Sequence, residues 1–128
     1  ARSEERCQPR PLQEWREAGI VDRSAFKKAG DLGFLMIWPE EKYGGMGDAD
    51  FRYEQIIIEE TARAGCKGWF NTLHSRLVGS YFKRFGTDEQ RDRFLPKCVS
   101  GETILAIAMT EPGAGSDLAG MRTTAGRT

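Results

Sequence analysis

The chain has 128 residues, and its 19 basic and 19 acidic side chains leave no net charge at pH 7. A chain of this length can bury a hydrophobic core in one domain. The balanced charge argues against nucleic acid or an anionic membrane surface as a partner. No apolar run approaches the roughly 20 residues of a membrane-spanning helix, and the sequence does not show a signal peptide.

Cysteine and histidine usage predicts neither a disulfide framework nor a zinc site. The three cysteines, Cys7, Cys66 and Cys98, are scattered and odd in number, which indicates free thiols in a reducing compartment. There is no CxxC pair, and His74 is the one histidine, so the ligand spacing of a structural zinc site is missing.

The first third of the chain contains two predicted helices. Residues 1–11 are polar and interrupted by two prolines, which predicts a flexible arm. A short helix is expected over Leu12–Glu17. A second is expected over Ser24–Leu32, because Asp22 is a good N-cap and Gly33 a good C-cap.

An apolar extended run over Phe34–Pro39 leads into a loop over Glu40–Gly47 that contains three glycines. Such a loop forms a turn or brings its backbone close to a phosphate. The next helix is expected over Ala49–Ala64, capped by Asp48 or Asp50. Its periodicity predicts a buried apolar side and an outward charged side. The apolar side comprises Tyr53, Ile56, Ile57, Ile58 and Ala64, and the charged side Glu54, Glu59, Glu60 and Arg63.

The densest aromatic surface in the chain lies on a helix predicted over Lys67–Phe85, and we expect it to form the core. Its stripe consists of Trp69, Phe70, Leu73, Leu77, Val78, Tyr81, Phe82 and Phe85. His74 lies within this helix and is interpreted as a core or pocket-lining residue, not a general base. Thr87 and Gln90 have the spacing of a capping box. They predict a further short helix, with a break or restart at Pro96.

After Ser100 and Gly101 the composition changes. Ile104–Met109 is an apolar run that predicts a buried strand. The polar stretch Thr110–Asp117 follows, and its glycines would let backbone amides approach an anion or a flat ring. It lacks the third glycine of a dinucleotide fingerprint and the Gly-Lys-Ser/Thr of a Walker A loop. From these residues alone, a cofactor cradle and a simple turn capped by Ser116 or Asp117 both stay open.

Several motifs in a fixed order resemble one family. Ala108-Met-Thr-Glu-Pro-Gly-Ala-Gly-Ser-Asp117 is similar to the flavin-binding signature of acyl-CoA dehydrogenases. Upstream, Pro39–Gly47, Phe85–Arg91 and Ser100-Gly-Glu102 occur in the family's order. The likeness is greatest to the long-chain group. It implies an all-α helical bundle over residues 12–102, followed by the first strand or strands of a truncated β-domain over residues 103–128. The arm over residues 1–11 departs from the family pattern.

The resemblance also implies roles for particular residues. FAD would be bound by Ile107, Ala108, Met109, Thr110, Gly115 and Ser116. The main chain of Met109 and the Thr110 hydroxyl would hydrogen-bond the isoalloxazine ring. Gly115 and Ser116 would lie beside the pyrophosphate, and Ser116 would also contact the acyl-CoA substrate.

The implied reaction is FAD-dependent α,β-dehydrogenation of a fatty acyl-CoA to the trans-2-enoyl-CoA, with an electron-transfer flavoprotein as acceptor. The resemblance places the catalytic glutamate in a carboxyl-terminal domain beyond this chain, and it implies a homotetramer. The expected location is the bacterial cytoplasm or the mitochondrial matrix. An acyl-CoA oxidase is the alternative enzyme. A non-catalytic helical interaction domain is the alternative if the natural reading frame ends here.

Overall fold

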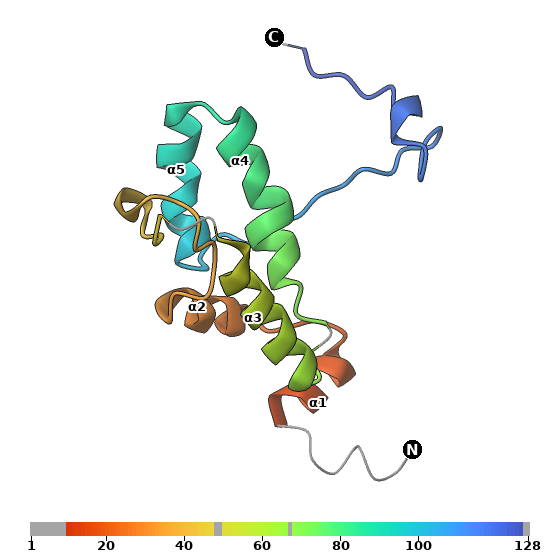
Figure 1. Cartoon of the computed structure of the whole chain (residues 1–128). Coiled ribbons are helices and arrows are strands. Elements are labelled where there is room, and N and C mark those ends of the chain that lie inside the picture. Colours follow the sequence, from red (N-terminus) through yellow and green to blue (C-terminus); the bar gives the residue numbers. More distant parts are fainter. Residues whose placement is uncertain (1–9, 48–49, 67, 127–128) are drawn as a thin grey trace.

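In the part of the chain that the structure describes, a body of five α-helices carries a long C-terminal segment that leaves it and lies to one side (Figure 1). The computed structural model describes residues 10–47, 50–66 and 68–126. The helices are α1 (Arg10–Ala18), α2 (Arg23–Asp31), α3 (Phe51–Arg63), α4 (Gly79–Phe85) and α5 (Asp88–Val99). A π-helical turn, η3 (Leu73–Val78), runs directly into α4, and the 3-10 turns are η2 (Glu41–Tyr43) and η4 (Leu118–Gly120). No helix in the described part is long and apolar enough to cross a membrane.

The helix ends follow the predicted caps. Asp22 accepts a hydrogen bond from the amide of Ser24 at 2.7 Å, and Asp50, not Asp48, caps α3 by accepting from Arg52 N at 2.9 Å. Thr87 and Gln90 form the predicted capping box. α1 starts at Arg10, so the predicted arm retains only residues 1–9, which lie outside the described residues.

The predicted break at Pro96 is wrong, because α5 continues through this proline to Val99. Only one intrahelical hydrogen bond is lost where a proline lacks its N–H. The buried side chains of Leu95, Cys98 and Val99, around this proline, pack into the core. Their burial holds the last turn in place, and α5 ends where predicted, at Ser100 and Gly101.

The core consists of two adjoining clusters. The first contains Met36, Tyr43, Leu95, Cys98 and Val99. The second contains Phe26, Ala29 and Leu35. Segment 34–39, between α2 and η2, supplies buried residues to both clusters. The short apolar run that was predicted as extended therefore contributes to both core clusters.

The π-helical turn η3 holds segment 34–38 through side-chain hydrogen bonds. Ser75 Oγ accepts from the amide of Met36 at 3.1 Å and donates to Asn71 Oδ1 at 2.6 Å. Asn71 Nδ2 donates to the carbonyl of Phe34 at 3.2 Å, and the Trp38 indole donates to the Ser75 carbonyl at 2.9 Å. Single π-helical turns occur often at functional positions, and this one joins two distant parts of the chain.

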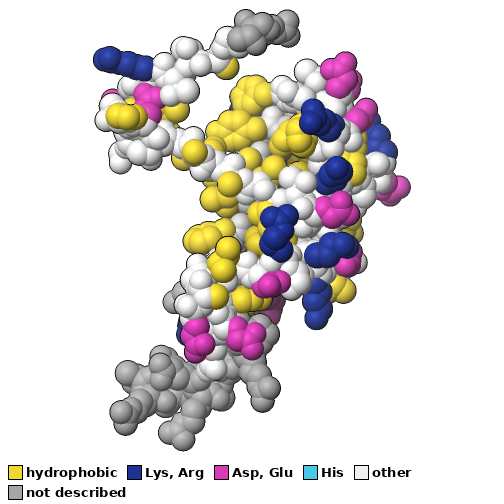
Figure 2. All heavy atoms as spheres, turned by 180° about the vertical axis from the view of Figure 1, so that it is seen from behind, with side chains coloured by type: hydrophobic (Ala, Val, Ile, Leu, Met, Phe, Trp, Pro, Cys, Tyr) yellow, Lys and Arg dark blue, Asp and Glu magenta, His cyan; other side chains and the backbone are white. Residues whose placement is uncertain are grey.

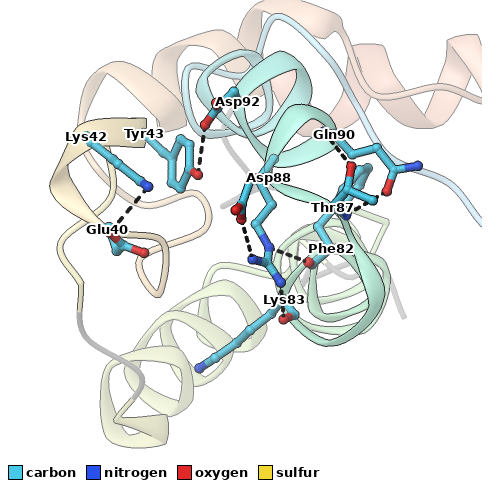
Figure 3. A network of polar contacts seen from close by, with 10 residues as sticks. Glu40, Lys42, Tyr43, Phe82, Lys83, Thr87, Asp88, Gln90 and Asp92 are labelled. Atoms are coloured by element: carbon cyan, nitrogen blue, oxygen red, sulfur yellow. Dashed lines mark hydrogen bonds and ion pairs between the residues drawn. The ribbon is translucent and has the colours of Figure 1, made fainter.

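A polar network joins the end of α4 to the start of α5 and to η2 (Figure 3). Arg91 on α5 donates to the carbonyls of Phe82 and Lys83 at 3.0 and 3.1 Å. These carbonyls lie in the last turn of α4, where the main chain lacks its full set of intrahelical donors; the Phe82 carbonyl also accepts from the Gly86 amide at 3.1 Å. Tyr43 of η2 donates to Asp92 at 3.0 Å. These contacts fix the helical hairpin and hold the glycine loop against α5.

The glycine loop is a turn. The amides of Met46 and Gly47 donate to the carbonyls of Ile37 and Pro39 at 3.0 and 2.7 Å. A Cβ on Gly45 would lie 2.1 Å from the Pro39 carbonyl oxygen. The glycines of this loop let it approach the protein's own main chain at Ile37 and Pro39. The loop is therefore the predicted turn and not a phosphate-binding loop.

The predicted buried faces of two helices are wrong. On α3, Glu54 is 1% exposed while Ile56 is 58% exposed, and Tyr53 and Ile58 are also exposed. The helix predicted over Lys67–Phe85 begins only at residue 71, so Trp69 and Phe70 precede it. Phe70 is 66% exposed, and Leu77, Tyr81 and Phe85 are exposed as well. Trp69 and Phe82 pack against the core from partly buried positions. Periodicity identifies an apolar side, but a side is buried only where the chain has something to cover it. Figure 2 shows the resulting band of hydrophobic side chains on one face.

Candidate functional site

The candidate site lies on the C-terminal segment, which is anchored to the helical body at residues 103–105. The amide of Thr103 donates to the Lys97 carbonyl at 3.0 Å. Ile104 packs against the Phe26 cluster and Leu105 against the Met36 cluster. Because successive side chains of an extended chain point to opposite sides, the two residues reach one cluster each.

His74 completes this anchor. The ring is 1% exposed, its Nδ1 accepts from the amide of Leu105 at 3.0 Å, and its Nε2 lies 3.1 Å from the Cys98 carbonyl. Burial lowers the pKa of His74, and the Cys98 carbonyl opposes this shift. The prediction of a core or pocket-lining histidine is confirmed.

Beyond the anchor the segment is extended but is not part of a sheet. In the described chain there is no β-ladder, and the one bridge joins Glu111 to Ala114. The amides of residues 106–110 donate to nothing in the described part of the chain. The predicted strand at Ile104–Met109 is thus not confirmed, because a strand requires a neighbour to pair with.

The turn after the extended segment is closed by Glu111. Its amide and carbonyl exchange hydrogen bonds with Ala114 at 2.9 and 3.1 Å. Its carboxylate accepts from the amides of Arg122 and Thr123 and from the Thr123 hydroxyl. The Thr123 hydroxyl and these amides lower the pKa of Glu111. Residues 111–123 therefore form a defined loop, which the Glu111 carboxylate closes.

The six residues predicted to bind a cofactor lie close together in the chain on this segment. Ile107, Ala108, Met109 and Thr110 occupy the extended part, and Gly115 and Ser116 follow the turn. Ile107 is half-buried and the other five are exposed. A Cβ built on Gly115 meets nothing within 4 Å. Whether these residues contact a cofactor stays a prediction.

A hollow of about 670 Å³ lies beside this loop. It is lined by Glu111, Pro112, Gly113, Asp117, Gly120, Arg122 and Thr123. None of the six predicted residues is among them, so the hollow is separate from the predicted cofactor surface.

Sequence reasoning missed two sets of buried polar groups. Glu54 is buried on α3, and its Oε1 has no hydrogen-bond partner in the described chain. Asn71 and Ser75, four residues apart, flank His74 on the inner side of the aromatic helix. Polar residues at this spacing share one helical face, which was the available signal for the second set. No feature of the sequence indicated that Glu54 would be buried.

Comparison with known proteins identifies the family. Residues 3–102 match the family model described as acyl-CoA dehydrogenase, N-terminal domain. The chain is 47% identical over 115 residues to the mitochondrial long-chain specific acyl-CoA dehydrogenase of Rattus norvegicus, an alignment that covers 90% of this chain and 26% of that protein.

Solved structures agree. The acyl-CoA dehydrogenase of Geobacillus kaustophilus is 50% identical with a TM-score of 0.77, over 84% of this chain and 28% of that one. A chain of the ChsE4-ChsE5 complex of Mycobacterium tuberculosis is 38% identical with a TM-score of 0.69, over 87% of this chain and 29% of that one. The chain thus spans about a quarter of the length of its relatives. It belongs to the acyl-CoA dehydrogenase family and carries the helical amino-terminal domain of that family.

Proposed function

We propose that the chain is the amino-terminal part of a longer flavoenzyme that dehydrogenates a fatty acyl-CoA to the trans-2-enoyl-CoA. The observation that carries the proposal is the family membership established by the match over residues 3–102. The relatives are about four times as long, since the alignment covers 26% of the rat protein. The remaining domains, including the glutamate that removes the α-proton, would come from the rest of that polypeptide.

Features of the C-terminal segment support FAD as the cofactor. The amides of residues 106–110 have no acceptor in the described chain, and a flavin ring edge offers acceptors to such donors. The Thr110 and Ser116 side chains are exposed. Gly113 and Gly115 leave the backbone open, as a pyrophosphate requires for close approach. These donors and the open backbone fit the two polar parts of FAD.

In the reaction, FAD when bound supplies the acceptor for the β-hydride. The residues of this chain would orient the ring through Met109 and Thr110, hold the pyrophosphate at Gly115 and Ser116, and contact the acyl-CoA through Ser116. The helical body would form one wall of the acyl cavity and exclude water. An electron-transfer flavoprotein would receive the electrons, and the longer protein would be a homotetramer.

The test is to express the full-length protein and measure bound FAD and enoyl-CoA formation. We expect stoichiometric FAD, reduction of a flavoprotein acceptor, and weaker FAD binding in Thr110→Ala and Ser116→Ala. Ser80→Ala, an exposed serine on α4, is the control and leaves both readouts unchanged. A full-length protein that neither binds FAD nor forms enoyl-CoA would refute the proposal. Oxygen consumption without reduction of the acceptor protein would indicate the oxidase.

A further inference from the structure

The buried imidazole of His74 is the link between the helical body and the segment that carries the predicted flavin residues. It contacts both sides of that junction, the Cys98 carbonyl near the end of α5 and the Leu105 amide at the start of the segment. The ring packs edge-on against Phe26 of α2 at 5.9 Å between centroids. With 1% of the residue exposed, the ring is enclosed by the core.

The two contacts determine the tautomer of the ring. A main-chain amide only donates and a carbonyl only accepts, so Nδ1 must carry a lone pair and Nε2 the hydrogen. The imidazole is therefore neutral, which agrees with the downward shift of its pKa by burial. In this tautomer only Nδ1 can accept from the Leu105 amide, and only Nε2 can donate to the Cys98 carbonyl.

The Leu105 amide is the last amide of the segment that binds the helical body before the bridge at Glu111. Ile107, the first predicted flavin residue, lies two residues further along. An extended chain advances about 3.3 Å per residue, so a shift or rotation at Leu105 is transmitted directly to the amides of residues 107–110. A misplacement of about 1 Å at a reacting group can cost about a hundredfold in rate.

We propose that His74 is a positioning residue for the flavin, which it orients through the Leu105 amide without touching cofactor or substrate. The inference rests on the proposed function, since it requires that residues 107–110 bind FAD. Its specific content is that the Nδ1 bond to Leu105, not the Nε2 bond to Cys98, sets flavin affinity. A residue that only filled the core would show no such difference between its two nitrogens.

Two substitutions separate the bonds. In His74→Asn the side-chain oxygen takes the place of Nδ1 and keeps an acceptor for Leu105. In His74→Gln the amide nitrogen takes the place of Nε2 and keeps a donor for Cys98. Each variant loses one hydrogen bond. The Cys98 carbonyl also accepts from the Gly101 amide at 3.3 Å, whereas His74 Nδ1 is the acceptor of the Leu105 amide. Thr87→Ala, which removes a cap far from the segment, controls for general destabilisation.

The experiment measures FAD dissociation from the full-length protein and hydrogen exchange of the peptide that contains Leu105. We expect the FAD Kd to rise about tenfold in His74→Gln, the effect of one lost hydrogen bond, and to stay within about threefold of wild type in His74→Asn and Thr87→Ala. Exchange at Leu105 accelerates in His74→Gln and stays protected in His74→Asn, a readout that needs no flavin.

The possible failures are distinct. If wild type binds FAD and His74→Gln binds it equally well, or His74→Asn is as weak as His74→Gln, the positioning role is refuted while the proposed function stands. If wild type itself binds no FAD, the proposed function falls and this role falls with it.

Discussion

The hydroxyl of Ser75 on η3 accepts a hydrogen bond of 3.1 Å from the amide of Met36, a residue held at a φ of 44°. Positive φ is uncommon and costly for residues other than glycine, and both partners are fully buried.

We expect Ser75→Ala to lower the free energy of unfolding by about 1–3 kcal/mol, because it leaves a buried amide without an acceptor. Urea unfolding measures this loss. Ser80→Ala, on an exposed serine of α4, which follows η3 directly, is expected to change stability by less than about 0.5 kcal/mol. Equal effects of the two would contradict the role of Ser75.

Glu54 predicts an unusual pH dependence. Burial raises the pKa of Glu54 above 4.5, against the opposing effect of Arg76. The folded chain therefore holds this proton more tightly than the unfolded chain. The stability that the group contributes is complete below pH 4.5 and is lost as pH rises through the folded pKa.

We therefore expect Glu54→Gln to stabilise the chain at pH 7 by about 1 kcal/mol, because it removes a buried charge with an unsatisfied oxygen. The advantage over wild type shrinks as pH falls toward 4.5. Unfolding free energies of both proteins across this range test it. A difference that does not vary with pH would show that ionisation of Glu54 is irrelevant.

Gly101 and Gly33 offer a matched pair for the packing of α2 against the end of α5. Both have positive φ, 76° and 75°. A Cβ on Gly101 would lie 2.3 Å from the Phe26 carbonyl oxygen, whereas one on Gly33 meets nothing within 4 Å. Gly33→Ala should cost about 1 kcal/mol from backbone conformation alone, and Gly101→Ala a further 1–3 kcal/mol or so because the backbone must shift. Thermal unfolding of the two variants compares them, and similar melting temperatures would rule out close contact at Gly101.

The sequence predicted best what is decided within a few residues. The Asp22, Asp50 and Thr87 caps depend on neighbours two or three positions away, and all three were found. The buried face of α3 depends on surfaces distant in sequence. There Glu54 is buried and Ile56 exposed, contrary to the prediction, while Glu59, Glu60 and Arg63 are exposed as predicted. The same limit applies to Ile104–Met109, which pairs with no other segment among the described residues. His74 was placed correctly because a lone histidine in an apolar helix is usually core, but its two partners could not be read from the sequence.

The exposed side of α3 can be tested by truncation. Ile56 is 58% exposed and Leu35 is 1% exposed. In this 128-residue chain, Ile56→Ala should therefore cost less than about 0.5 kcal/mol, and Leu35→Ala about 2–5 kcal/mol. Chemical denaturation gives both values. A large loss from Ile56→Ala would mean that the originally predicted face is buried in solution.

The hydrogen bonds of Ser75 and His74 have a consequence for the order in which the chain folds. They close two large loops at one helical turn, because Ser75 is joined to Met36 across 39 residues and His74 to Leu105 across 31. Capped helices form from local contacts, but loop closure costs entropy before any contact repays it. The slow step of folding is then expected to be the arrival of segment 34–38 and of Leu105 at η3, so substitutions at Ser75 would lower the folding rate more than those at the helix caps.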